Sequence, residues 1–314
     1  MNELICRDIQ SVFGVRICSF EPVSGGWLNE KWRAETDAGE ILIKRYSHER
    51  YNRRKLAQIE QALCRQMRVY EAGVPCPRAW RAGETIIRRP SEQIDYVVMD
   101  FLPGISAGSE NVNLQQMEAL GAACARMHEA FRPLPPEGVE GFPLNGQRLI
   151  DALCETVRRG REKCPADAPE EYREAMARAG EWADKADFSF LNRLERGIAH
   201  EDFTPDNMLF SETGFSAILD FDRNRYSFPL HDVGRILLSL ALHDGKIDGE
   251  RVCAFRRGYV NLKDKDIYDS FMLTALIEIP WWIQPEYFRE SSLKVQRFIT
   301  EMLFLADNIS ENGR

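Results

Sequence analysis

Two acidic segments in the second half of the chain contain residues whose types and spacing suit catalysis. In HEDFTPDN, Asp202 and Asn207 lie five residues apart, and the apolar stretch AILDFD brings Asp220 thirteen residues after Asn207. A carboxylate can orient a hydroxyl group and accept its proton, and amide and carboxylate oxygens are ligands that Mg²⁺ prefers. Phosphoryl transfer from ATP requires these groups and few others. We therefore predict that Asp202 is the catalytic carboxylate and that Asn207 and Asp220 hold Mg²⁺.

The order of these two segments resembles that of the aminoglycoside phosphotransferase and choline kinase-like superfamily, small-molecule kinases with a protein-kinase-like fold. An isolated Asp-x₄-Asn would fit an ordinary surface loop, but HEDFTPDN followed by ILDFD is fairly specific, and the resemblance extends from about Phe20 to Leu240. It implies supporting roles for His200, which precedes the catalytic carboxylate, and for Asp232 in HDVGR, which would brace the catalytic loop.

The same resemblance assigns nucleotide-binding roles to the first hundred residues. Gly25 and Gly26 in SGGWLN stand where relatives carry a loop that covers the nucleotide, although paired glycines also fit a plain hairpin. Lys44 in ILIKR matches the strand lysine that contacts the α- and β-phosphates, and Glu60 on the following helix is our choice for the carboxylate that holds it. The alternative for Glu60 is an ordinary surface charge on a helix.

Periodicity predicts an α+β chain in two lobes. Strands are expected at Glu30–Thr36, Glu40–Tyr46, Thr85–Arg89 and Tyr96–Phe101. Apolar residues at three- and four-residue spacing predict helices at Arg53–Glu71 and Leu114–Phe131. We expect a small antiparallel sheet lobe with one helix over residues 1–100, a hinge over 101–104, and a larger, mainly helical lobe over 105–314. The resemblance implies that backbone groups of Asp100, Phe101 and Leu102 hydrogen-bond the adenine. Because any side chain could stand at these positions, the sequence does not indicate whether the nucleotide is ATP or GTP.

Two departures from a protein kinase support a small-molecule acceptor. Asp222 stands where the D-F-G motif of protein kinases has glycine, and only ten residues separate it from Asp232, too few for a long peptide-binding segment. Glu201 stands where the superfamily usually has glycine or a basic residue. Adjacent residues in an extended loop point apart, so we expect Glu201 to face away from Asp202.

Composition narrows the class of partner and the compartment. The formal net charge is −8, but residues 1–100 hold 16 Lys and Arg against 14 Asp and Glu, which leaves −10 on the rest of the chain. An acidic surface argues against a nucleic-acid partner. The sequence has no apolar run long enough for a membrane span, and its eight cysteines include no C-x-x-C pair. We expect a cytoplasmic protein with reduced thiols; the sequence does not indicate its oligomeric state.

Aromatic and acidic residues near the C-terminal end of the chain bear on the acceptor. Trp281, Trp282 and Glu278 lie in EIPWWIQPEYF and, with the acidic second lobe, favour a cationic amino alcohol or an aminoglycoside-like sugar as acceptor. The aromatic residues also fit core packing, and homoserine, a methylthio-sugar or another neutral metabolite remains open. The alternative function is a catalytically inactive kinase-like binding or spore-coat-type protein, although such a protein would be expected to lose one of Lys44, Asp202, Asn207 or Asp220.

Overall fold

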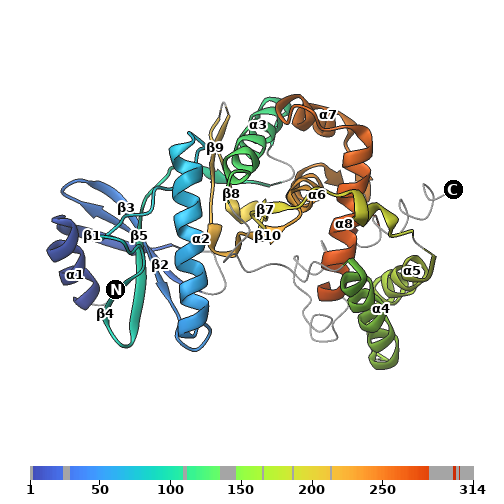
Figure 1. The fold of residues 1–314 in the computed structure, drawn as a ribbon, viewed down its shortest axis with the longest axis horizontal. Coiled ribbons are helices and arrows are strands. Elements are labelled where there is room, and N and C mark those ends of the chain that lie inside the picture. The colour runs from blue at the N-terminus through green and yellow to red at the C-terminus, as the bar shows by residue number, and fades with distance from the viewer. Residues whose placement is uncertain are drawn as a thin grey trace.

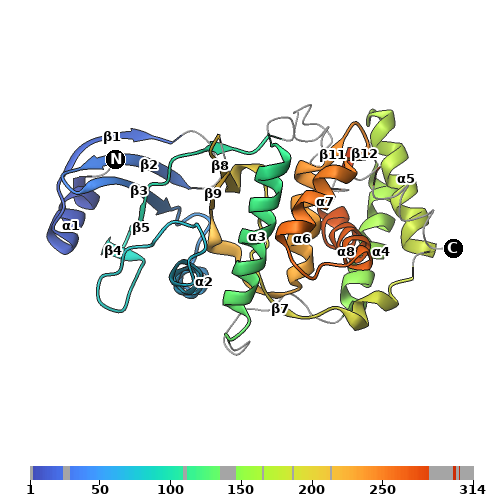
Figure 2. The same cartoon turned by 90° about the horizontal axis from the view of Figure 1, so that it is seen from above.

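The chain folds into two lobes that lie at opposite ends of its long axis (Figure 1). This computed structural model describes residues 3–23, 29–108, 112–134, 146–164, 166–185, 187–212, 214–282, 300–301 and 304. The first lobe is built on a sheet, the second is mainly helical, and α3 and strands β8 and β9 lie between them (Figure 2). The arrangement is the predicted α+β architecture.

The first lobe contains a five-stranded antiparallel sheet with the order β1-β2-β3-β5-β4. The strands are β1 (Ile17–Pro22), β2 (Glu30–Thr36), β3 (Gly39–Tyr46), β4 (Arg88–Ser91) and β5 (Ile94–Asp100). Alternation along β3 sends Ile41 and Ile43 to one face of the sheet and Leu42 and Tyr46 to the other. Lys44 shares the second face, which is how the strand aims it at the other lobe.

Two helices cover the two faces of this sheet. Helix α2 (Arg53–Glu71) has the predicted bounds, and Asn52 caps it by accepting a hydrogen bond from the N–H of Lys55. Helix α1 (Glu3–Phe13) buries Ile5 and Ile9 against the opposite face. The prediction of one helix in this lobe was therefore wrong, because the sheet has a second apolar face that also has to be covered.

The second lobe combines helices with short strand pairs. Helix α3 (Leu114–Phe131) and helix α6 (Pro229–Leu240) contribute to one apolar core together with β8 (Met208–Phe210) and β9 (Phe215–Ile218). The other elements are β6 (Ile105–Ser106), α4 (Gly146–Lys163), α5 (Glu170–Lys185), η1 (Ser189–Arg193), β7 (Gly197–Ala199), η2 (Pro205–Asn207), η3 (Phe221–Arg223), β10 (Arg225–Ser227), β11 (Leu242–His243), β12 (Lys246–Ile247), α7 (Gly249–Gly258) and α8 (Asp264–Trp282). A second core joins α4, α5 and α8.

Residues 101–104 run between β5 and β6 without regular structure and connect the two lobes. Other contacts between the lobes include side-chain pairs, the packing of α2 against η3 and α3, and a hydrogen bond from the N–H of Ile218 to the carbonyl of Pro75 at 2.9 Å. No helix in the part of the chain described above has both the length and the apolar character needed to cross a membrane.

Candidate active site

The loop between β7 and β8 carries Asp202 and Asn207 and holds them against each other. The amide nitrogen of Asn207 donates hydrogen bonds to the backbone oxygen of Asp202 at 2.9 Å and to its Oδ2 at 3.2 Å. The side-chain oxygen of Asn207 is therefore the atom left for a ligand. Because the side chain of Asn207 binds both the backbone and the carboxylate of Asp202, it fixes the orientation of Asp202.

Asp232, in the first turn of α6, supports this loop from behind. Its two carboxylate oxygens accept the backbone N–H groups of His200 at 2.7 Å and Glu201 at 2.9 Å. Nε2 of His128 on α3 lies 2.9 Å from one of these oxygens, and its Nδ1 lies 2.8 Å from the hydroxyl of Tyr259. Asp232 is 1% exposed, so the buried charge is satisfied entirely by the loop and by α3.

His200 connects the loop to the segment that carries Asp220. Its Nδ1 accepts the N–H of Asp202 at 3.3 Å, so Nε2 carries the proton and donates to the carbonyl of Leu219 at 3.0 Å. The ring of His200 also packs between Phe203 and Phe221. His200 is thus part of the scaffold, in the supporting position that the resemblance implies.

Asp220 follows β9 in the left-handed backbone conformation, with φ of 60°. The N–H of Leu219 donates to the carbonyl of Asn207 at 2.9 Å, which fixes the two segments side by side. An amide oxygen and a carboxylate are the kinds of ligand that Mg²⁺ prefers, so Asn207 and Asp220 would be the residues that hold it. Within the described residues, no three His, Cys, Asp or Glu side chains gather as a metal site.

Lys44 reaches across from β3 and is almost completely buried, with 3% of its surface exposed. Its Nζ lies 2.8 Å from Asp220 and 2.8 Å from Asp222, and Lys31 adds a second positive charge 3.7 Å from Asp220. Burial opposes the charge of Lys44, but the two carboxylates outweigh it and raise the pKa of the amine above its usual range. Burial likewise opposes ionisation of Asp220, and the two lysines lower its pKa.

The predicted pairing of Lys44 with Glu60 is absent from this structure. Both carboxylate oxygens of Glu60 accept backbone N–H groups, from Ile86 and from Ile87, each at 2.7 Å. This places Glu60 at the segment that enters β4 and leaves Asp220 and Asp222 as the acids on Lys44. The position of Glu60 on its helix did not show that other acids lie closer to Lys44.

The other predicted nucleotide contacts are placed in part. Gly25 and Gly26 lie outside the described residues. At the end of β5, the side chain of Asp100 accepts hydrogen bonds from Arg78 and Trp80, and the N–H of Phe101 donates to the carbonyl of Glu40 at 3.3 Å. Because that N–H is engaged, an adenine base would have to use other backbone groups of Asp100, Phe101 or Leu102.

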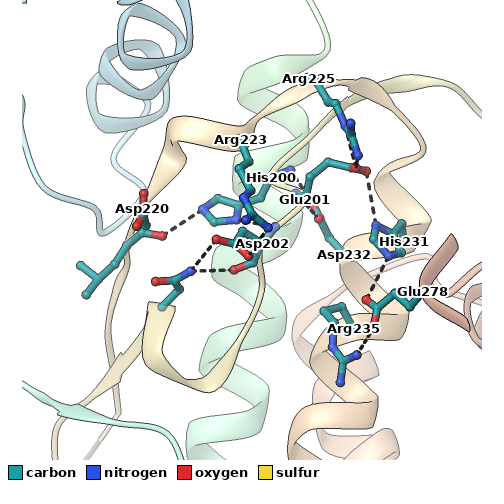
Figure 3. A network of polar contacts seen from close by, with 12 residues as sticks. His200, Glu201, Asp202, Asp220, Arg223, Arg225, His231, Asp232, Arg235 and Glu278 are labelled. Carbon is teal, nitrogen blue, oxygen red and sulfur yellow. Dashed lines mark hydrogen bonds and ion pairs between the residues drawn. The ribbon is translucent and has the colours of Figure 1, made fainter. Parts of the chain in front are cut away.

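The side chain of Arg223 lies next to the carboxylate of Asp202 (Figure 3). A guanidinium nitrogen of Arg223 is 3.3 Å from Oδ1 of Asp202, and 59% of the arginine side chain is exposed. Burial raises the pKa of Asp202, while Arg223 opposes this rise and Asp220 adds to it. A carboxylate with a raised pKa is a better proton acceptor, which suits the predicted role of Asp202.

Glu201 points away from Asp202, as expected, into a buried network of acids and bases. Its carboxylate is 1% exposed, accepts a hydrogen bond from Nε of Arg225 at 2.8 Å and lies 3.3 Å from Nδ1 of His231 (Figure 3). His231 continues to Glu278, and Glu278 to Arg235. Glu301 lies 2.7 Å from Arg235 and completes the set. We call these six residues the acid–base network: Glu201, Arg225, His231, Glu278, Arg235 and Glu301.

The network corrects the role predicted for Glu278. Its carboxylate pairs with Arg235 and with His231, so its charge is already compensated inside the protein and does not offer a free anion to a cationic acceptor. Burial opposes ionisation, but Arg235 and His231 hold the pKa of Glu278 at about 2. Trp281 and Trp282 form the last turn of α8, and their side chains lie outside the described residues.

Several residues of the site were not predicted to belong to it. For Asp222 the sequence contains one indication, because this acid stands where the D-F-G motif of protein kinases has glycine. Its contact with Lys44 could not be predicted, because the contact forms only when the two lobes come together. Arg223, His231 and Arg235 carried no such indication, because nothing in the sequence around them indicates which side chains they contact in the fold.

The fold and this site together define a class of protein, the small-molecule kinases with a protein-kinase-like fold. Residues 19–266 match the phosphotransferase enzyme family, and the chain belongs to that family. The predicted superfamily and the predicted enzyme class, a phosphotransferase with an alcohol group as acceptor, are confirmed.

Individual relatives are distant. The chain is similar to a homoserine kinase of Gluconobacter oxydans (strain 621H), with 24% identity over 290 residues, 88% of this chain and 85% of that enzyme. In fold it is similar to spectinomycin phosphotransferase in complex with ADP and spectinomycin, with a TM-score of 0.66, 11% identity and coverage of 100% and 98% of the two chains. Amicoumacin kinase in complex with AMP-PNP, Ca²⁺ and Ami gives a TM-score of 0.64, 15% identity and coverage of 100% and 95%.

Proposed function

We propose that the protein transfers the γ-phosphate of ATP, in the presence of Mg²⁺, to a hydroxyl group of a small molecule. The observation that carries this proposal is that three separate segments from two lobes bring Lys44 to Asp220, and bring Asp202 and Asn207 together beside that acid. The relatives in complex with ADP and AMP-PNP support a nucleotide as donor, and the Ca²⁺ in one of them supports a divalent metal.

Each residue has a defined task in this reaction. Asp202 accepts a hydrogen bond from the acceptor hydroxyl, aims its oxygen at the phosphorus and takes up its proton. Lys44 contacts the phosphates, and Asn207 and Asp220 would hold the metal, whose charge neutralises the phosphate oxygens. Most of the rate enhancement then comes from positioning and from electrostatic stabilisation.

For the acceptor, we propose an amino alcohol that also carries a carboxylate, such as homoserine. The acidic second lobe favours an amine, as the sequence indicated, while the exposed guanidinium of Arg223 beside Asp202 favours a carboxylate close to the reacting hydroxyl. The similarity to a homoserine kinase supports the same class. A purely cationic amino alcohol or an aminoglycoside-like sugar would satisfy only the first of these features.

A panel of acceptors tests the proposal. ADP release with Mg²⁺ and ATP should be measured for homoserine, choline, ethanolamine, simple sugars and aminoglycosides, with Asp202→Ala as the inactive control. Turnover that is unchanged in Asp202→Ala would contradict the mechanism. Turnover of choline or aminoglycosides but not homoserine would contradict the proposed acceptor. Absence of both nucleotide binding and turnover would favour the alternative, a kinase-like binding protein.

A further inference from the structure

The anchoring of Lys44 differs from a direct pairing with a carboxylate on the neighbouring helix. Helix α2 contains two acids, Glu60 and Glu71. Glu60 uses both oxygens on the backbone of Ile86 and Ile87, and Glu71 pairs with Arg68 at the exposed end of the helix. Neither acid of α2 is therefore directed at Lys44, and a lysine that is 3% exposed needs another standing partner.

Asp222 has the geometry of that partner. Its Oδ2 lies 2.8 Å from Nζ of Lys44, and its Oδ1 accepts the hydroxyl of Tyr46 at 3.3 Å. Tyr46 is completely buried and lies two residues after Lys44 on the same face of β3. Both oxygens of Asp222 are thus bound to one strand, with 10% of the side chain exposed.

Asp220 is unsuited to this anchoring role once the metal is bound. It lies 24% exposed at the open side of the lysine, with Lys31 as its second cation. In the proposed function Asp220 is a metal ligand, so its carboxylate is committed to the metal during catalysis. Asp222 is then the carboxylate that stays with Lys44 while the lysine contacts the phosphates.

Helix α2 still acts on Lys44, but through a relay. Asn224, two residues after Asp222, is buried and clamped by α2: Arg65 donates to its side-chain oxygen at 2.5 Å and to its backbone oxygen at 3.0 Å. The amide nitrogen of Asn224 donates to the carbonyl of Ala62 at 2.9 Å. Any shift of α2 therefore moves the segment that carries Asp222.

We propose that Asp222, held by Tyr46 and by the clamp of Arg65 on Asn224, is the positioning residue for Lys44 in place of a helix carboxylate. This inference rests on the proposed function, because it assigns Lys44 to the phosphates. Asp222 acts through Lys44 and does not itself contact the substrate.

The first experiment compares two isosteric substitutions, Asp222→Asn and Glu60→Gln. Loss of one charge-assisted hydrogen bond to the lysine should lower kcat of Asp222→Asn by about 10- to 100-fold with little change in KM for the acceptor. Glu60→Gln should retain a kcat close to that of the wild type. An equal loss of kcat in both variants, or a loss in Glu60→Gln alone, would restore the helix carboxylate as the anchor.

The dependence on metal distinguishes an anchor from a metal ligand. If Asp222 holds Lys44, the kcat of Asp222→Asn should stay low at all Mg²⁺ concentrations. If higher Mg²⁺ restores the rate, Asp222 is a metal ligand and the proposal fails. Arg65→Ala should act in the same direction through the relay, and the effects of Arg65→Ala and Asp222→Asn should not add, because both act on one contact. Full additivity would remove the relay from the proposal.

A second readout does not need turnover. In the nucleotide-free protein, labelling of Lys44 by an amine-reactive reagent, quantified by peptide mass spectrometry, should rise severalfold in Asp222→Asn and remain at the wild-type level in Glu60→Gln. Unchanged labelling in Asp222→Asn would overturn the proposal. If the wild type transfers no phosphate to any acceptor, the proposed function fails, while this measurement still decides whether Asp222 holds Lys44. Tyr46→Phe, which removes one hydroxyl, is the milder variant if Asp222→Asn does not fold.

Discussion

Asp202 is held with Oδ2 on Asn207, which also donates to the backbone oxygen of Asp202, and with Oδ1 near the exposed guanidinium of Arg223. Replacement by asparagine keeps the shape of the side chain and removes its ability to take up a proton. We predict that Asp202→Asn lowers kcat by about 10²- to 10⁴-fold, the usual contribution of a positioned proton acceptor, while ADP still binds.

The matched control for this variant is Asp206→Asn in the same loop, at an exposed position. Steady-state kinetics and calorimetric titration with ADP measure the two effects. An Asp202→Asn protein that turns over as fast as Asp206→Asn would show that Asp202 takes no part in the proton transfer.

At this scale the sequence indicated residues suited to phosphoryl transfer, because that reaction requires particular groups in a particular order. Asp202, Asn207 and Asp220 could be found for that reason. The partners of Glu60 and Glu278 could not, since a carboxylate pairs with whichever donor the folded chain brings within about 3 Å. The spacing of residues along the chain does not determine the distance between a carboxylate and its donor.

Among the elements, α6 contributes most to the catalytic loop, because Asp232 in its first turn receives two N–H groups of that loop and a ring nitrogen of His128. Asp232→Asn leaves at least one of these buried donors without an acceptor. We predict a loss of about 2–3 kcal/mol in the free energy of unfolding, measured by urea denaturation. A stability equal to that of the wild type would mean that the loop is held by other contacts.

The acid–base network joins the catalytic loop to β10, α6 and α8, and its stability should depend on pH. Although burial opposes protonation, Glu201 and Glu278 raise the pKa of His231 from 6.5 to about 10. Because the pKa of His231 is higher in the folded state, its protonation stabilises the fold fully below about pH 6.5, and this stabilisation is lost as the pH rises to about 10. Burial opposes ionisation of Glu201 and Glu278, but their partners lower the pKa of each from 4.5 to about 2. The stabilisation that comes from these two charged carboxylates is lost as the pH falls from about 4.5 to about 2.

We therefore predict that the wild type exceeds His231→Asn in unfolding free energy most strongly between about pH 4.5 and 6.5. Above about pH 6.5 the difference should narrow by up to about 1.4 kcal/mol per pH unit. Urea denaturation at about pH 6 and about pH 9.5 measures it. His243→Asn on the β11–β12 hairpin, outside the network, is the control. A difference that is constant across this range would mean that His231 is not protonated in the fold.

The sequence predicted the limits of some elements more closely than those of others. Helices α2 and α3 have the predicted bounds because each combines a clear apolar stripe with an asparagine cap. Helix α1 was missed, although its buried residues Ile5 and Ile9 lie four positions apart, as on one face of a helix. Strand β4 (Arg88–Ser91) lies a few residues beyond the predicted Thr85–Arg89, because its pairing with β5, not its own composition, sets its limits.

The whole molecule brings its two lobes together at Lys44, where one strand of the sheet lobe meets two acids of the helical lobe. A nucleotide that contacts both lobes should stabilise the folded state by mass action. With Mg²⁺ and ADP at about 100 times the dissociation constant, we predict a gain of about 2.7 kcal/mol in unfolding free energy. Denaturation with and without the ligand measures it, and Lys44→Met at the same ADP concentration should gain much less. An equal gain would place the phosphates away from Lys44.

The division into residues 1–100, 101–104 and 105–314 remains a prediction of how these parts behave as units. Charge counting and a change in periodicity suggested it, and the irregular segment 101–104 between β5 and β6 is compatible with it. What the sequence could not supply was the set of contacts across the division, such as Arg65 with Asn224, which are 159 residues apart.

The ion pair between Arg235 and Glu301 joins residues that are 66 positions apart, and it bears on how the protein matures during translation. Both acids that pair with Arg235, Glu278 and Glu301, follow it in the chain, so α6 is synthesised before either of its charge partners. The sheet lobe, whose five strands end at Asp100, can fold while the remainder is still being made. The catalytic lobe, in contrast, acquires its final charge balance only after Glu301 has been added, and nascent chains stalled before that point should remain sensitive to proteases in α6 and α8.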